Sequence, residues 1–131
     1  HTSTFMGHPV GCAMALAQVA EVERSRLAER SARLGCRLLR RMQQIKPPPG
    51  LRIEARGLGL MAGLELRRND GSPATAEALH IVKEMLRRGL IVLPEGETSN
   101  VISFTPPLTI RESQLDHATD TLEKVMKSFK P

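Results

Sequence analysis

The chain opens with "HTSTF", a run of small hydroxyl side chains directly ahead of a helix signal. Ser3 and Thr4 can donate hydrogen bonds, and Pro9 suits the first position of a helix because its missing N–H costs nothing there. Hydroxyls and free backbone N–H groups ahead of a helix can hold a phosphate. A polar loop that only caps the helix uses the same residue types and is commoner. Spacing alone leaves both interpretations open.

A second motif, "RGLGLMAG", has the composition of a dinucleotide-binding loop but not its spacing. Its glycines stand at positions 57, 59 and 63, which gives G-x-G-x-x-x-G, and no phosphate-binding helix follows. We therefore expect a turn in which two backbones pack closely.

A third candidate is a stripe of arginines on the segment between residues 26 and 41. Its members are Arg26, Arg30, Arg33, Arg37, Arg40 and Arg41. Such a stripe could bind nucleic acid, but no aromatic residues are interleaved with it and no recognition motif surrounds it. We predict a solvated helix face, or one that crosses a subunit boundary, and no nucleic-acid partner.

Composition sets further limits on function. The 131 residues suffice for one core, the net charge is +5, and aromatic residues make up only 2%, so the core must be aliphatic. Cys12 and Cys36 lack metal-ligand spacing, which indicates reduced thiols and a cytoplasmic location. His80 and His117 have no partner at ligand spacing, so we expect no metal. The longest apolar run is too short to span a membrane.

The elements that would position these residues follow from periodicity. From Val10 to Val22 a helix is apolar on nearly every face, which predicts burial on several sides against something larger than this chain. The next helix has one apolar stripe, formed by Leu27, Leu34, Leu38, Met42 and Ile45. It ends at "KPPPG", a stiff extended connector.

From residue 51 the predicted order is strand, strand, helix, strand, strand, helix. This order indicates an α/β class domain, a small sandwich with helices on a mixed or antiparallel sheet. We expect Ser72 to cap the first of these helices and Thr109 with Glu112 to form a capping box at the second. "LIVLP" is interpreted as a buried strand.

Three stretches resemble one family of enzymes, in order and in register. "HTSTFMGHPVGCAMAL" resembles the H-x-x-T-F-x-G-N-P-x-x-C-A-x-A segment of class III (ω-amino acid type) pyridoxal-phosphate-dependent aminotransferases. "EARGLGLMAGLEL" resembles the family's V-R-G-x-G-L-x-x-G-I-E-L. "RRGLIVLPEGETSNVISFTPPLTIRESQLDHA" resembles its closing run around N-V-I-R-x-x-P-P-L. Together they cover essentially the whole chain.

The resemblance implies the C-terminal part of such an enzyme, a fold type I transferase. Residues 1–46 would end the large cofactor-binding domain, and residues 51–131 would form the small C-terminal domain. Thr4, aided by Ser3, would bind the phosphate of pyridoxal 5'-phosphate across the interface of a homodimer. Residues near Ser103 would form one wall of the substrate entrance.

The activity implied is transfer of an amino group from an amine or amino acid to a 2-oxo acid. The lysine that holds the cofactor in this family has no counterpart here, so we expect this chain alone to be inactive. Two alternatives stay open: lyase chemistry of the amino-alcohol phosphate type, and a free-standing, non-catalytic binding or assembly module.

This sequence departs from the family pattern at two positions. His8 replaces the usual asparagine and can still cap a helix. Ser103 replaces an arginine that, in the family, holds a substrate carboxylate through a two-pronged hydrogen bond. Serine cannot replace that charge, so the substrate preference of ornithine-type or aminobutyrate-type members cannot be transferred. Arg56 matches the family arginine ahead of the Gly-x-Gly turn, and we interpret it as structural more than catalytic.

Overall fold

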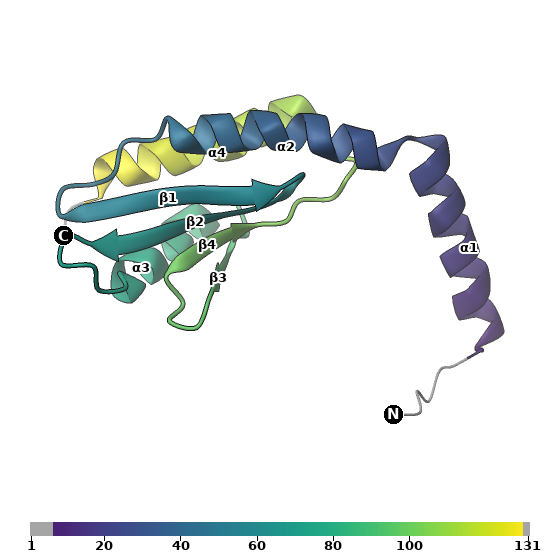
Figure 1. The fold of residues 1–131 in the computed structure, drawn as a ribbon, viewed down its shortest axis with the longest axis horizontal. Coiled ribbons are helices and arrows are strands. Elements are labelled where there is room, and N and C mark those ends of the chain that lie inside the picture. Colours follow the sequence, from purple (N-terminus) through teal and green to yellow (C-terminus); the bar gives the residue numbers. More distant parts are fainter. Residues whose placement is uncertain (1–6, 130–131) are drawn as a thin grey trace.

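The computed structural model describes residues 7–129 as four helices and a four-stranded sheet (Figure 1). In chain order the elements are α1 (Pro9–Arg24), α2 (Leu27–Gln43), β1 (Leu51–Leu58), β2 (Met61–Arg68), α3 (Thr75–Arg87), β3 (Leu93–Glu95), β4 (Val101–Phe104) and α4 (Glu112–Ser128). The strands lie in the order β1-β2-β4-β3, and each neighbouring pair is antiparallel. The predicted order of elements and the α/β class are confirmed, with the sheet antiparallel.

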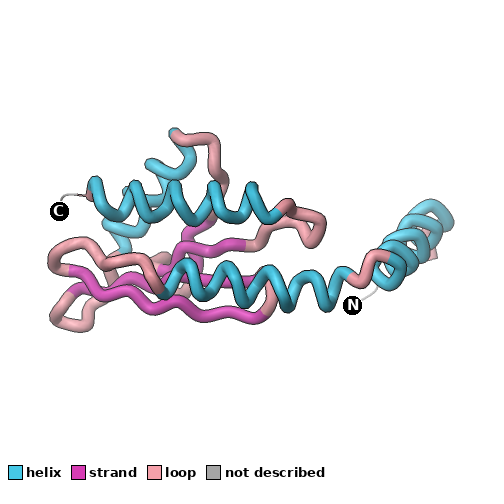
Figure 2. Tube along the Cα trace, turned by 90° about the horizontal axis from the view of Figure 1, so that it is seen from above, coloured by secondary structure: helices cyan, strands magenta, loops and turns pink. Residues whose placement is uncertain are grey.

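One face of the sheet forms the core, because every second strand residue points toward the helices. Leu64, Leu66 and Ile102 are fully buried on this face. The helices α2, α3 and α4 cover it with aliphatic side chains, and α2 and α4 lie side by side (Figure 2). The residues they contribute include Leu34, Leu38, Met42, Ala78, Ile81, Met85, Leu115, Leu122, Val125 and Met126. The aliphatic core expected from the composition is confirmed.

Helix α2 shares this core with the strands. Its Leu34, Leu38 and Met42 are completely buried, and the helix packs on β1 and β2. The boundary that the sequence suggested at residue 46 therefore falls between a helix and the sheet on which it packs.

The Gly-x-Gly motif is the tip of the β1–β2 hairpin, where it contacts α2. A Cβ atom on Gly35 of α2 would come within 2.0 Å of the Gly59 carbonyl oxygen, and Gly59 itself has a φ of +56°. The hydroxyl of Ser31 accepts a hydrogen bond from the Leu60 N–H at 3.1 Å. The expectation of a turn with close backbone packing is confirmed. The two backbones that meet are those of Gly59 in the hairpin and Gly35 on helix α2.

Helix α1 lies apart from this body and projects from one end of it (Figure 1). None of its residues is buried, and within residues 7–129 it packs only against α2. The chain turns between the two helices at Arg26, whose φ is +47°. The expected burial of this helix on several sides is thus not supplied by the rest of the described chain.

Three local predictions were wrong. Helix α3 begins at Thr75, because Ser72 instead forms a turn with Asp70, donating its N–H and hydroxyl to the carboxylate. Helix α4 begins at Glu112, and the Arg111 N–H donates to the Gln114 side chain, so Thr109 is not the cap. Strand β3 spans only Leu93–Glu95 at the sheet edge, with Leu93 exposed, and is not a buried strand.

Candidate functional site

Ser103 lies on the open face of the sheet, the face that no described helix covers. The strand register places Arg56 opposite Gly63, Gly63 opposite Ser103, and Ser103 opposite Leu93. These four residues form a line across all four strands, which we call the cross-sheet row. Side chains one residue away along each strand point into the core instead. Ser103 is thus half-buried in the middle of a surface that chain outside this structure, or a ligand, can contact.

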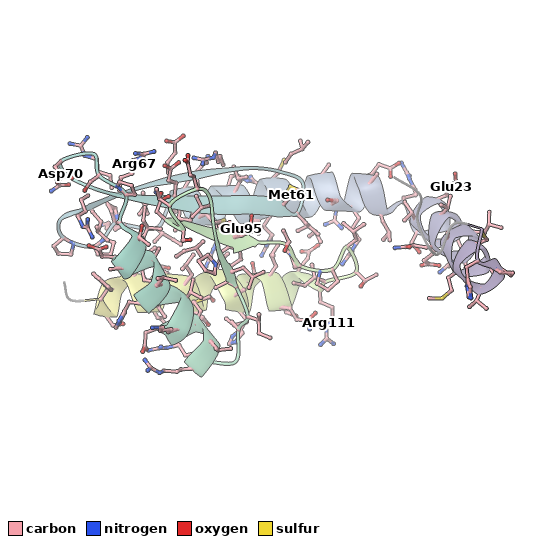
Figure 3. The ribbon with its side chains drawn as sticks, turned by 90° about the horizontal axis from the view of Figure 1, so that it is seen from below. Glu23, Met61, Arg67, Asp70, Glu95 and Arg111 are labelled. Atoms are coloured by element: carbon pink, nitrogen blue, oxygen red, sulfur yellow. The ribbon has the colours of Figure 1, made fainter. Side chains whose placement is uncertain are left out.

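Next to the cross-sheet row lies a charged cluster on the same face. The Glu65 carboxylate is paired with Arg56 and, at 2.6 Å, with the Nη2 atom of Arg67. Its side chain is only 12% exposed, whereas both arginine side chains are more than half exposed. Hydrogen bonding from Arg56 holds the pKa of Glu65 below its ordinary value, and the same bond raises the pKa of Arg56. Figure 3 shows Arg67 and Met61 toward opposite ends of β2.

A groove of about 800 Å³ runs from Ser103 past the end of β4 to the start of α4. Its walls are mostly apolar, with Leu93, Pro106 and Ile110 among them, and His117 and Gln114 add polar groups from α4. Sequence reasoning found Ser103 but missed the groove, because the loop from Thr105 to Ile110 has no periodicity that reveals which strand and helix it joins.

Thr4 and Ser3 lie outside the described residues, so the structure places only the helix that follows them. The N-terminus of α1 is capped by the Nδ1 atom of His8, which accepts the Gly11 N–H at 3.3 Å. The first turn of α1 contains no acidic residue. An anion ahead of α1 would meet the positive end of its helix dipole, and no acidic residue of the first turn would oppose it. The predicted cap role of His8 is confirmed.

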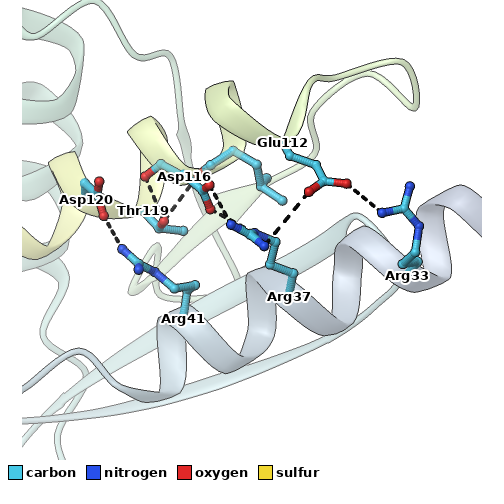
Figure 4. A network of polar contacts seen from close by, with 8 residues as sticks. Arg33, Arg37, Arg41, Glu112, Asp116, Thr119 and Asp120 are labelled. Atoms are coloured by element: carbon cyan, nitrogen blue, oxygen red, sulfur yellow. Dashed lines mark hydrogen bonds and ion pairs between the residues drawn. The ribbon is translucent and has the colours of Figure 1, made fainter.

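The arginine stripe is engaged within the fold. Arg33 pairs with Glu112 at 2.6 Å, Arg37 pairs with Asp116 through two hydrogen bonds of 2.9 and 2.7 Å, and Arg41 pairs with Asp120 (Figure 4). We call these three pairs the α2–α4 ladder. Arg30 donates to the carbonyls of Leu108 and Ile110. Four of the six stripe arginines thus contact α4 or the loop that precedes it.

A sequence signal for the ladder existed and was missed. Arginines recur every four residues on α2, and the acids Glu112, Asp116 and Asp120 recur every four residues on α4. Residues at that spacing lie on one helical face, so the two rows match in period and in opposite charge.

Neither a catalytic amine nor a metal centre is found in the part of the chain that the structure describes. Lys46, Lys83, Lys124 and Lys127 are all exposed on the surface. Residues 7–129 contain no group of three or more His, Cys, Asp or Glu side chains arranged to hold a metal ion. In the same range, every helix is too short or too polar to cross a bilayer.

Comparison with known proteins identifies a family that matches nearly the whole chain. The family model "Aminotransferase class-III" matches residues 1–126. Putrescine aminotransferase of Pectobacterium atrosepticum is 39% identical over 130 residues, which are 95% of this chain and 26% of that protein. Acetylornithine aminotransferase of Synechocystis is 33% identical, over 98% of this chain and 29% of that protein.

Solved structures give the same result for the fold. A Bacillus anthracis aminotransferase superposes with a TM-score of 0.85 at 29% identity, over 98% of this chain and 30% of that chain. A phospholyase from Arthrobacter, solved with phosphoethanolamine, also superposes with a TM-score of 0.85, but at 24% identity this shows the fold alone.

The chain thus spans less than a third of the length of the relatives named here. Within that span, the family model covers nearly every residue, and the sheet and helices superpose on solved members. This chain belongs to the class III aminotransferase family.

Proposed function

We propose that this chain is the C-terminal part of a pyridoxal-phosphate-dependent aminotransferase, which transfers an amino group between an amine or amino acid and a 2-oxo acid. The observation that carries the proposal is the family match over residues 1–126. The similarity to a phospholyase concerns the fold and gives no reason to prefer lyase chemistry. A free-standing module fits less well, because α1 exposes Val10, Met14, Leu16 and Val19, which no element within residues 7–129 covers.

In this proposal the residues ahead of α1 hold the cofactor phosphate. Thr4 donates its hydroxyl to the phosphate, Ser3 assists, and the N-terminus of α1 adds a favourable dipole. The phosphate belongs to the site of the neighbouring subunit in a homodimer. When bound, the cofactor supplies an electron sink for the substrate carbon. In this proposal the residues of this chain bind and orient the cofactor and the substrate.

The packing suggests how the chain divides between the two domains. We assign α1 to the large cofactor domain, because its apolar faces are uncovered here. We assign α2 to the small domain with the sheet, because Leu34, Leu38 and Met42 lie in the same core as the strands. This proposal moves the boundary from residue 46 to the bend at Arg26. The open face of the sheet, with Ser103, then forms a wall of the substrate site.

The chain by itself should not catalyse the reaction. Its described lysines are all exposed, whereas a cofactor-binding lysine needs a desolvated or electropositive environment to act as a nucleophile at neutral pH. We propose a cytoplasmic location on the basis of the free thiols Cys12 and Cys36.

The test uses the intact protein that contains this chain. We expect it to absorb as a pyridoxal-phosphate enzyme and to transfer an amino group to a 2-oxo acid. Thr4→Val should weaken cofactor retention by about 10- to 100-fold, the loss expected for a hydrogen bond to a charged group. Thr2→Val, two residues away, is the matched control and should have little effect.

Two results would contradict the proposal separately. An intact protein that neither binds pyridoxal phosphate nor transaminates any amine would overturn the function. Equal cofactor retention in Thr4→Val and wild type would leave the function in place and remove Thr4 from the phosphate site.

A further inference from the structure

We propose that the groove beside Ser103 binds the tail of the substrate, the part beyond the reacting carbon, and that this tail is long, mainly apolar and uncharged. The inference deepens the proposed transaminase function and rests on it, because it takes Ser103 as part of the substrate wall. It names a substrate class, amines or amino acids whose far end carries no charge. The groove volume of about 800 Å³ lies in the range of small-molecule sites.

The surroundings of Ser103 give a bound substrate one direction in which to extend. On the β2 side, the Val101 side chain fills the space above Gly63, because a Cβ atom on Gly63 would come within 2.9 Å of the Val101 Cγ1 atom. On the β3 side, Ser103 and its partner Leu93 both line the groove, and Leu93 is 55% exposed. A substrate that contacts Ser103 can therefore extend past the end of β4 rather than across β2.

The lining of the groove determines which kind of tail fits. Among the described residues that line it, none is an aspartate, glutamate, lysine or arginine. The charged residues nearest along the chain, Glu95, Arg111 and Glu112, are not part of the lining. A charged group bound here would lose part of its hydration without gaining a counter-charge, which costs free energy. The groove therefore selects against a tail that ends in an ammonium or a carboxylate.

The walls of the groove also offer apolar contact that is exposed in this structure. Ile91 is 81% exposed and lies just ahead of β3, and Leu93 continues the same wall. Pro106 and Ile110 add apolar surface from the loop between β4 and α4. An alkyl chain that covers these side chains removes apolar surface from water on both partners, which is the driving force for binding.

Two polar side chains of α4 can bind an uncharged polar group at the end of such a tail. Gln114 and His117 are three residues apart, so they lie on one face of the helix. The Gln114 carbonyl oxygen accepts the Arg111 N–H at 3.0 Å, so its NH₂ group is the part that can donate to a ligand. The tail can therefore end in a hydroxyl or an amide as well as in a methyl group.

The first test measures how well the intact enzyme uses amines of increasing length. We expect kcat/KM to rise about fourfold per methylene from propylamine to heptylamine, the gain from burying one methylene. 1,6-Diaminohexane has nearly the length of heptylamine but ends in an ammonium group, and its kcat/KM should be about 10- to 100-fold lower. A kcat/KM that does not depend on length, or equal use of these two amines, overturns the inference.

Two leucines of nearly equal exposure supply matched variants. Leu93 lines the groove, whereas Leu86 of α3 is 57% exposed and lies outside it. Leu93→Glu places a carboxylate at the groove, so kcat/KM for 1,6-diaminohexane should rise relative to that for heptylamine by about 10-fold. Leu86→Glu should leave this ratio unchanged. A folding defect alone does not shift the preference toward the diamine, and equal ratios in the two variants contradict the inference.

A binding measurement separates this inference from the proposed function. 1-Heptanol has the tail but no amino group, so its binding to the intact protein requires no turnover, and saturation-transfer NMR detects weak binding. Binding that is lost in Leu93→Glu and kept in Leu86→Glu supports the inference even in a protein that does not transaminate. A protein that transaminates short amines but does not bind 1-heptanol keeps the proposed function and overturns the inference.

Thermal melting tests for a different occupant of the groove. If another segment of the intact protein filled it, Leu93→Glu would disturb that packing and lower the melting temperature well below that of Leu86→Glu. In that case 1-heptanol would not bind to the wild-type protein either. These two results together would also overturn the inference.

Discussion

Helices α1 and α2 are consecutive and of similar length, yet their environments are opposite. Helix α2 buries Leu34, Leu38 and Met42 completely and is tied to α4 by the α2–α4 ladder. Helix α1 buries no residue, and its Leu16 is 73% exposed. The apolar content of a helix therefore does not reveal whether this chain covers it. In α2 one stripe is apolar and matches one sheet, whereas in α1 small apolar residues occur on nearly every face.

This difference shows which helix finds its packing partners within the described chain and which does not. The stripe of α2 specifies one partner surface, and that surface is present in the sheet. The all-round apolar pattern of α1 specifies several partners, and residues 7–129 supply only α2. Helices of this second kind require additional protein for their stability, because a helix of this length is marginal in water without tertiary packing.

The largest expected effect is on the free energy of unfolding, when a leucine of each helix is replaced by alanine. Leu38→Ala removes a completely buried side chain, so it should lower the free energy of unfolding of this chain by about 2–5 kcal/mol. Leu16→Ala on α1 should change it by less than about 0.5 kcal/mol, as for an exposed position. Urea denaturation of the isolated chain measures both. Similar losses for the two variants would mean that α1 is buried in solution.

The next prediction compares the same substitution, glycine to alanine, at one position on each helix, where we expect opposite effects on stability. Gly35→Ala places a Cβ atom against the Gly59 carbonyl, so the hairpin must move, and we expect a loss of about 1–3 kcal/mol in urea denaturation. Gly11→Ala on α1 meets nothing closer than His8 atoms at 3.9 Å. It should therefore strengthen that helix by up to about 1 kcal/mol, seen as slower amide hydrogen exchange in α1. A stabilising Gly35→Ala would contradict the close approach.

Several parts of the fold could be predicted from sequence because the signals are local. The stripe of α2 and the alternation of β4, with Ile102 inside and Ser103 outside, follow directly from the periods of helix and strand. Helix starts were less predictable. Ser72 and Thr109 have the right chemistry for caps, but each lies in a loop whose path is set by contacts with distant elements, such as the bridge from Pro73 to Arg67.

The candidate site was harder to predict because it depends on register. Ser103 was identified by resemblance, but its alignment with Gly63 and Arg56 requires two strand pairings, from β1 to β2 and from β2 to β4. A shift of one residue in either pairing would place Arg56 out of line with Ser103. Hence the sequence alone could not show that Arg56 and Ser103 lie in one row across the sheet.

The smallest expected effect concerns the pH dependence of the α2–α4 ladder. Helix α1 has no similar row of ion pairs to the sheet or to the other described helices. The hydrogen bonds from Arg37 hold the pKa of Asp116 below its ordinary value. A lowered pKa in the folded state means that the pair stabilises the fold above the ordinary pKa of aspartate. This stabilisation is lost as the pH falls through the lower, folded value.

Arg37→Gln should therefore reduce the stability of the chain at pH 6 but have much less effect at pH 2, and added salt should shrink the difference. Arg40→Gln is the matched control on the same helix, because Arg40 donates to the Cys36 carbonyl and contacts no carboxylate between residues 7 and 129. Urea denaturation at the two pH values measures both variants. If Arg37→Gln cost the same stability at both, the contact of Arg37 with α4 would depend on the packing of its side chain rather than on charge. The Arg37 pair would then contribute no charge-dependent stability, and only the ladder pairs of Arg33 with Glu112 and of Arg41 with Asp120 could still distinguish α2 from α1 by charge.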